Sequence, residues 1–181
     1  MIHLKKILLL AALLTGAWNI QAEEKIEGSL AELKGETKIK VVEDWTGTAI
    51  AGKSLEDWLL FRQTEQPNYD AKHEWEEELK PRLLEDLPRT ANEKMTKTNL
   101  FLVRDVDTRF VMTIHPVSVE KKGNCIITCT IREAKTGHQL AQIVIEGNGG
   151  KFGSMSNLWG DGFRSAGKEL GALMVMALKK F

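Results

Sequence analysis

The stretch from Phe110 to Glu146, FVMTIHPVSVEKKGNCIITCTIREAKTGHQLAQIVIE, decides the fold of this chain. It contains three apolar-rich runs that are typical of β-strands: Phe110–Val119, Cys125–Glu133 and His138–Glu146. The links between them, Lys121–Asn124 and Ala134–Gly137, are short and contain glycine. Because such short links join antiparallel neighbours, the sequence predicts an antiparallel meander.

Alternation along these strands predicts one buried and one more polar face. On one face lie Cys125, Ile127, Cys129 and Ile131 of the middle strand, with Ala141, Ile143 and Ile145 of the third. The other face of the middle strand carries Ile126, Thr128, Thr130 and Arg132. We therefore expect helices to cover only the apolar side of the sheet.

Helices are predicted on both sides of this region along the chain. Ser54–Asp57 resembles a capping box that opens a short helix ending near Arg62. Residues 70–96 repeat apolar side chains every four positions, and Pro81 and Pro88 should break or kink this long segment. Its charged residues are expected to be solvated: Glu74, Glu76, Glu77, Glu78, Arg82 and Glu85.

A final helix is predicted over Gly162–Lys179, where small residues could allow a close approach to the sheet: Ala166, Gly167 and Gly171. Thr37–Trp45 alternates well enough for a first strand. The predicted fold class is α+β, a two-layer domain with an antiparallel-meander sheet and helices packed on one face. The predicted element order is β-α-α-β-β-β-α.

The first 22 residues have the layout of a secretory signal peptide. Two lysines precede an apolar run from Ile7 to Trp18, and a short polar stretch ends at Ala22. An uncleaved anchor is the alternative, although the run is shorter than the roughly 20 residues of a membrane-spanning helix. We expect residues 1–22 to be removed and residues 23–181 to form a single α+β domain, periplasmic or secreted. The short signal suits a bacterial envelope, and a eukaryotic secretory route stays open.

Charge and composition restrict the partners of the mature chain. The whole chain is formally neutral, and removal of Lys5 and Lys6 leaves a small acidic excess. No overall basic field exists to attract nucleic acid, so we expect no nucleic-acid partner. No later segment is long and apolar enough for a transmembrane span, which leaves an unknown protein or envelope component as the expected partner.

The two cysteines, Cys125 and Cys129, are predicted to be reduced and buried. In a regular strand they would point to one face about 13 Å apart, whereas a disulfide needs Cα atoms within about 7 Å. An intermolecular bridge or a metal site is the sharper alternative, but further ligands for a metal are not evident.

The stretch Gly47–Ser54, GTAIAGKS, matches the pattern of a phosphate-binding loop. Export argues against a nucleotide ligand, and so do the hairpin links of the later strands, because that fold uses parallel crossovers. We therefore expect no nucleotide here, no cofactor and no metal, and interpret Ser54 as a helix cap.

Residues 147–162 contain six glycines and form the best candidate for a ligand or partner loop. The binding residues we predict within it are Gly149, Gly150, Phe152 and Trp159. A flexible connector with no binding role is the alternative. The tryptophans could line a binding surface, although buried packing is commoner for this residue.

No complete catalytic set is present in the sequence. His73, His115 and His138 are scattered, and no G-x-S-x-G elbow occurs. Asp105 and Asp107 could form a carboxylate pair, but two carboxylates do not complete a site. The leading hypothesis is a non-enzymatic binding protein. The alternative is a small exported hydrolase that uses Asp105, Asp107 or the acid-rich helix.

Four phrases of the sequence resemble a group of uncharacterised exported proteins of Gram-negative envelopes: Ile39–Asp44, Ala51–Trp58, Asn92 and Ala166–Gly171. The element order is also similar to small α/β domains of envelope assembly factors, such as the curli secretion channel protein and the amino-terminal domain of the Tol-system propeller protein. This resemblance implies an envelope accessory or interaction role, by analogy of fold alone. It implies no particular binding residue.

Overall fold

The computed structural model describes residues 25–181, so the predicted signal peptide and its cleavage site lie outside the described residues. The strands are β1 (Ile26–Gly28), β2 (Lys38–Glu43), β3 (Ala49–Ile50), β4 (Phe101–Val103), β5 (Phe110–Val119), β6 (Cys125–Glu133) and β7 (Gln139–Gly147). The helices are the 3₁₀ turn η1 (Ala31–Leu33), α2 (Leu55–Glu65), α3 (Ala71–His73), the π-helix η2 (Glu74–Leu79), α4 (Pro81–Met95) and α5 (Met155–Leu178).

The sheet is mixed, so the predicted antiparallel-meander sheet is wrong as a description of the fold. Its strand order is β1-β7-β6-β5-β2-β4, and β3 pairs with β5 beside this path. Strands β5, β6, β7 and β1 are antiparallel neighbours, whereas β2 runs parallel to both β4 and β5 and β3 runs parallel to β5. The predicted element order is wrong too, because β1, β3 and β4 were not foreseen.

The missed pairings follow from chain connectivity. Short links dictated antiparallel pairing only for β5, β6 and β7, whereas the chain that leaves β2 passes through the helices α2 to α4 before it returns to the sheet as β4 and β5. A connection that includes helices is long enough to bring a strand back in the parallel sense. Strands β1, β3 and β4 have only two or three residues each, which is too short for an alternating pattern.

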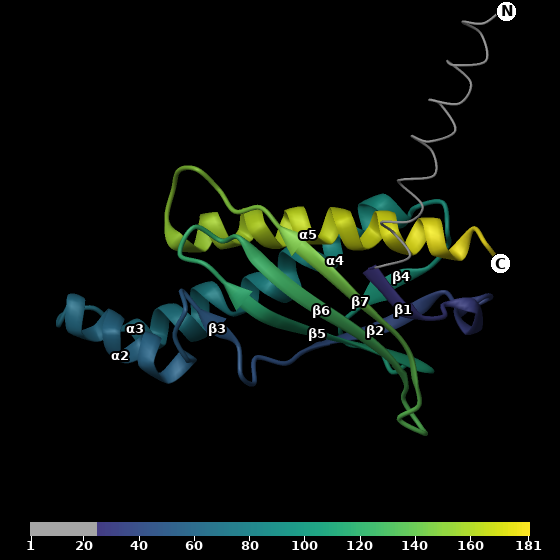
Figure 1. Cartoon of the computed structure of the whole chain (residues 1–181), viewed down its shortest axis with the longest axis horizontal. Helices are drawn as coiled ribbons and strands as arrows, with labels where there is room; N and C mark the ends of the chain where they lie inside the picture. Colours follow the sequence, from purple (N-terminus) through teal and green to yellow (C-terminus); the bar gives the residue numbers. More distant parts are fainter. Residues whose placement is uncertain (1–24) are drawn as a thin grey trace, which may run out of the picture.

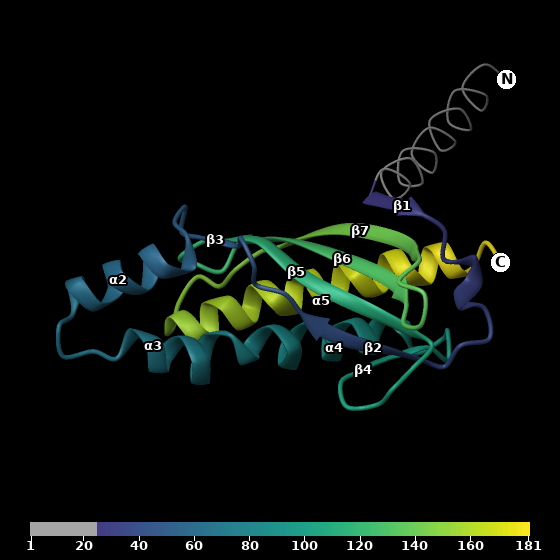
Figure 2. The same ribbon diagram turned by 90° about the horizontal axis from the view of Figure 1, so that it is seen from below.

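Helices α4 and α5 lie side by side under one face of the sheet, while α2 and α3 extend beyond the end of the strands (Figures 1 and 2). The core lies between these two layers. Phe110, Met112 and Ile114 of β5 meet the predicted apolar faces of β6 and β7, all of them buried. Asn92 of α4 also binds the backbone of β4, donating to the Leu102 carbonyl at 2.9 Å and accepting from its amide at 2.8 Å.

Gly167 and Gly171 of α5 face α4 and not the sheet as predicted. A Cβ atom at Gly167 would collide with the Leu87 carbonyl and Thr90 Oγ1, and one at Gly171 would lie 2.6 Å from the Ala91 carbonyl. Thr90 Oγ1 also donates to the Arg164 carbonyl at 3.1 Å. The two helices therefore touch backbone to backbone.

The long helical segment accommodates its four-residue repeat through a π-helix. A straight α-helix of 3.6 residues per turn would rotate such a row away from the core. In η2 the Lys80 amide donates to the Trp75 carbonyl, an i→i+5 bond. Pro81, which has no amide to donate, then opens α4, while Pro88 lies buried within it. The expectation of a solvated acidic surface is wrong for Glu74, which is buried.

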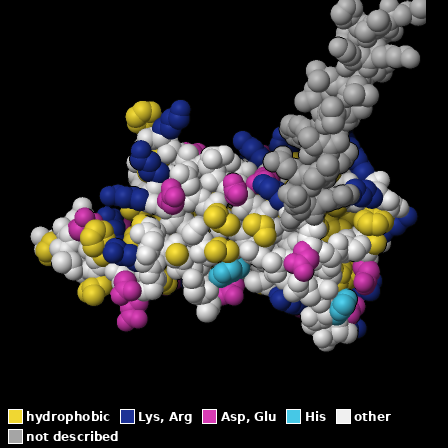
Figure 3. Space-filling view, viewed as in Figure 1, with side chains coloured by type: hydrophobic (Ala, Val, Ile, Leu, Met, Phe, Trp, Pro, Cys, Tyr) yellow, Lys and Arg dark blue, Asp and Glu magenta, His cyan; other side chains and the backbone are white. Residues whose placement is uncertain are grey.

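The opposite face of the sheet carries no helix among the described residues. Figure 3 looks onto this face and shows hydrophobic side chains near its centre. Val117 of β5, Ile126 of β6 and Val144 of β7 are exposed. No helix of residues 25–181 has the length and apolarity needed to span a membrane.

Candidate functional site

Trp159, one of the predicted binding residues, lies at the centre of a buried aromatic cluster. Its ring is 6.5 Å from Trp45, 6.1 Å from Trp58, 6.4 Å from Trp75 and 6.2 Å from Phe163. Trp58, Trp75 and Trp159 are almost inaccessible. The cluster joins α2, η2 and α5 to the connection after β2, which is a packing role.

An ion pair holds the hairpin formed by α2 and α3. Arg62 Nη2 lies 3.1 Å from Glu74 Oε2, and the two side chains are only 14% and 9% exposed. The guanidinium also lies 5.1 Å from the Tyr69 ring. Burial, followed by the neighbouring Glu74 carboxylate, raises the pKa of Tyr69 to about 12. On its outer side α2 exposes Leu60 and Phe61, and the Lys53 ammonium lies 5.2 Å from the Phe61 ring.

The stretch with the phosphate-loop pattern is bound to β5. The Ala51 amide donates to the Val119 carbonyl at 2.8 Å, Ile50 and Lys53 bind each other's backbone, and Thr48 Oγ1 donates to the Pro116 carbonyl at 2.7 Å. The amides of Ile50, Ala51 and Lys53 are thus engaged within the chain and are not free to surround a phosphate. Ser54 caps α2 by accepting from the Asp57 amide at 3.1 Å.

The glycine-rich loop is packed against its neighbours. The Gly149 amide donates to Asn124 Oδ1 at 2.9 Å, and Gly149 has no room for a Cβ beside the Lys122 carbonyl. Gly150 lies against Leu158 and donates to its carbonyl at 3.3 Å. Gly149 and Gly150 therefore position the loop. Phe152 projects from its tip and is 90% exposed, more than any other large apolar side chain of the described residues.

Three lysines lie at this end of the domain. Lys151 precedes Phe152, and Lys121 and Lys122 lie in the β5–β6 turn against which the loop packs; all three are exposed. Two acids neighbour the loop: Glu120 accepts a hydrogen bond from Asn124 Nδ2 at 2.9 Å, and Asp161, beside Gly150, is paired with Arg164 at 2.6 Å. We call Phe152, Lys151, Lys121 and Lys122 the loop end of the domain.

The residues of the predicted hydrolase alternative are not brought together. Asp105 and Asp107 are exposed in the β4–β5 connection. Lys40 Nζ donates a hydrogen bond to Asp107 Oδ1 at 2.9 Å, and this bond, followed by the positive charge of the ammonium group, lowers the pKa of that carboxyl. His115 Nδ1 lies 2.9 Å from the Asp44 carbonyl and makes no hydrogen bond or ion pair with Asp105 or Asp107.

Within residues 25–181 no cluster of three or more His, Cys, Asp or Glu could hold a metal ion. Cys125 and Cys129 are free and buried, as predicted.

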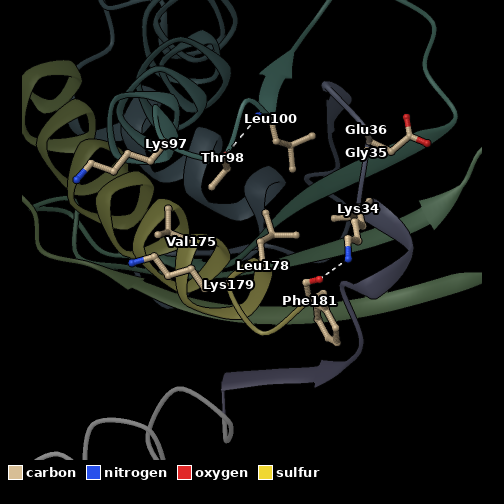
Figure 4. A pocket seen from close by; sticks show the side chains of 11 residues that line it. Lys34, Gly35, Glu36, Lys97, Thr98, Leu100, Val175, Leu178, Lys179 and Phe181 are labelled. Atoms are coloured by element: carbon tan, nitrogen blue, oxygen red, sulfur yellow. Dashed lines mark hydrogen bonds between the residues drawn. The ribbon is translucent and has the colours of Figure 1, made fainter.

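A pocket of about 280 Å³ lies at the opposite end, beside the C-terminus, and sequence reasoning missed it. Figure 4 shows Leu100, Val175 and Leu178 at its centre, with the Lys97 and Lys179 ammonium groups directed to one side. Lys34 Nζ donates to the Phe181 carbonyl on the other side. The pocket combines residues from η1, the α4–β4 connection and the end of α5, so no local sequence pattern announces it.

Comparison with known proteins gives neither a family nor a curated relative: no family profile and no curated protein matches the chain. Among solved structures, a PelC dodecamer from Paraburkholderia phytofirmans aligns with 80% of this chain and 94% of its own, at 11% identity and a TM-score of 0.38. A single-residue variant of that PelC in another crystal form aligns at 10% identity, covering 81% and 94%, with a TM-score of 0.39. A Xanthomonas campestris protein of family DUF330 aligns over 54% of this chain and 62% of its own at 6% identity, with a TM-score of 0.37.

Proposed function

We propose that the chain is an exported, non-enzymatic binding protein of the bacterial envelope, and that its loop end docks onto an anionic lipid surface. The observation that carries the docking proposal is Phe152, a phenylalanine 90% exposed at the tip of a firmly packed loop. Gly149 and Gly150 hold the loop in place, so little conformational freedom is lost when the tip is buried in a partner.

The lysines around the tip define the chemistry of the partner. An aromatic ring that enters the headgroup region, surrounded by Lys side chains that meet anionic headgroups, is the usual arrangement of a peripheral membrane contact. Each lysine near an anionic surface contributes about 1 kcal/mol. Burial of a phenylalanine side chain contributes about 1.5–3 kcal/mol when complete.

Vesicle co-sedimentation of the mature protein tests the proposal. We expect binding to phosphatidylglycerol vesicles that weakens as salt rises, and little binding to phosphatidylcholine vesicles. Phe152→Ala should weaken it about tenfold, the loss expected when roughly half of the ring's burial energy is removed. Lys151→Glu should weaken it at least as much.

Matched controls lie at the other end of the sheet. Phe101→Ala removes an exposed phenylalanine of β4, and Lys135→Glu reverses an exposed lysine of the β6–β7 turn. Both should bind vesicles like the unaltered protein. If no vesicles bind, or if the control variants lose binding equally, the loop end is not a membrane contact, and capture of a protein partner through Phe152 would then replace this proposal.

Export is tested separately by the intact mass of the secreted product. Removal of the signal after Ala22 gives a chain that begins at Glu23. A product that retains Met1 would contradict export through a cleaved signal.

A further inference from the structure

We propose that the pocket beside the C-terminus is a second binding site, which takes a ligand with an apolar chain and an anionic head. It is independent of the loop end, because the 24-residue helix α5 separates the two regions by about 36 Å. The pocket has a defined floor: Leu33 and Leu100 are buried, and Val175 and Leu178 of α5 are partly buried. An apolar floor with a few convergent polar groups is the usual construction of a small-molecule site.

The charge at the rim selects an anion. Lys97 comes from the α4–β4 connection and Lys179 from the end of α5, and their ammonium groups lie on the same side of the floor (Figure 4). Among the described residues, neither ammonium group has an ion-pair or hydrogen-bond partner. The acid of the lining, Glu36, shares Arg109 with Glu32 and Glu133. Its carboxylate is directed away from the side on which the Lys97 and Lys179 ammonium groups lie (Figure 4).

Three carbonyl groups at the end of α5 already accept hydrogen bonds within the chain. The amides of Lys179, Lys180 and Phe181 donate back to the carbonyls of Val175, Ala177 and Leu178 respectively. Lys34 donates to the Phe181 carbonyl and fixes the last residue at the far side of the pocket. An anionic head beside Lys97 and Lys179 with its chain over Leu100 and Leu178 therefore satisfies both parts of the lining.

Titration of ¹⁵N-labelled mature protein with decanoate, decyl phosphate and decanol tests the proposal by NMR. We expect both anions to shift the amides of residues 33–36, 97–100 and 175–181, and decanol to bind at least tenfold more weakly. Hexanoate should bind more weakly than decanoate, because its chain covers less of the floor. Preference for the carboxylate would indicate a fatty acid as the natural source, and preference for the phosphate a phospholipid-type head.

The double variant Lys97→Glu/Lys179→Glu should weaken decanoate binding at least tenfold. Lys168→Glu is the control, since Lys168 is an exposed lysine of the same helix outside the pocket. The amide spectrum of each variant shows whether it is folded. Absence of binding by both anions, equal binding of decanol, unchanged binding by the folded double variant, or shifts centred on another surface would each overturn the proposal. Phe152→Ala should leave decanoate binding unchanged, which separates this site from the loop end.

Discussion

The α4–α5 layer and the hairpin of α2 and α3 are held to the domain by different kinds of contact. Gly167 and Gly171 bring the backbones of α4 and α5 together, with the sheet core directly above. The hairpin extends beyond the strands and depends on side chains: the tryptophan cluster and the Arg62–Glu74 pair. Substitutions between α4 and α5 should therefore destabilise the domain through steric overlap, whereas substitutions in the hairpin should do so by removing the partner of a buried side chain. The following predictions test that difference.

The largest expected difference is in thiol reactivity within the sheet core. Burial raises the pKa of the thiols of Cys125 and Cys129 to about 12. Relative to an ordinary cysteine, a three-unit rise lowers the thiolate fraction at pH 8 about a thousandfold. We expect alkylation of the native protein to be slower than that of the denatured protein by at least this factor. Rapid labelling of the native protein would show that the core opens readily.

The same pKa shift gives a dependence of stability on pH. The pKa values of both thiols are raised in the folded protein. Below pH 9, the ordinary pKa of cysteine, the thiols are neutral in the folded and the unfolded chain, and their contribution to the free energy of unfolding is fully present. Above pH 9 the unfolded chain ionises first, and the free energy of unfolding should fall between pH 9 and 12. A Cys129→Ala variant, compared at both ends of this range, should show a weaker decline than the unaltered chain.

Gly167→Leu should destabilise the domain by about 3 kcal/mol through overpacking. The new side chain would meet the Leu87 carbonyl and Thr90 Oγ1, and backbone cannot move aside as a flexible side chain can. The free energy of unfolding from urea titration measures the effect. Ala172→Leu, on the exposed side of α5, is the matched control and should change it by less than about 0.5 kcal/mol.

Equal stability of the two leucine variants would contradict the close α4–α5 contact. If a partner chain packed on this side of α5, Gly167→Leu would instead leave the monomer stable and abolish an assembly, which size-exclusion chromatography detects.

Sequence patterns predicted the parts of the fold that carry their own periodicity. Strands β5 and β6 have the predicted bounds, and β7 is displaced by one residue. The start of α5 was missed: Ser154 caps it by accepting from the Asn157 amide, but the surrounding glycines predicted a loop. Those glycines permit close packing instead, since Gly162 lies against the carbonyl of Gly123 and Gly147 against that of Gly162.

The candidate sites were less accessible to sequence reasoning than the fold. Phe152 is exposed in a predicted binding loop, and its role stays a prediction, whereas Trp159 from the same stretch is buried. Glu74 looked like one of many surface acids, because its partner Arg62 lies on another helix. The C-terminal pocket assembles residues almost 150 positions apart, so only the folded chain brings them together.

Arg62→Ala should destabilise the hairpin by about 2 kcal/mol. Removal of the guanidinium leaves the buried Glu74 carboxylate without its partner, the costly way to break such a pair. This is less than the roughly 3–5 kcal/mol usual for a buried ion pair that loses one partner. The hairpin lies at the edge of the domain, where water can reach Glu74. Limited proteolysis within residues 54–80 and urea titration measure it, with Arg104→Ala, an exposed arginine, as the control.

Faster cleavage without a large change in global stability would show that the hairpin opens locally. No change in either measurement would mean that the Arg62–Glu74 pair does not hold it.

The smallest effect is a pKa within the hairpin. Tyr69 is the single tyrosine of the chain, so its ionisation can be followed by ultraviolet absorbance. We expect titration near pH 12, because burial and then the Glu74 carboxylate disfavour the phenolate, while Arg62 acts in the opposite direction. Glu74→Gln should therefore move the pKa down toward its ordinary value of 10, provided that circular dichroism shows the helices intact. In the unaltered protein, titration near 10 with the helices intact would mean that Tyr69 is not buried against Glu74 in the hairpin.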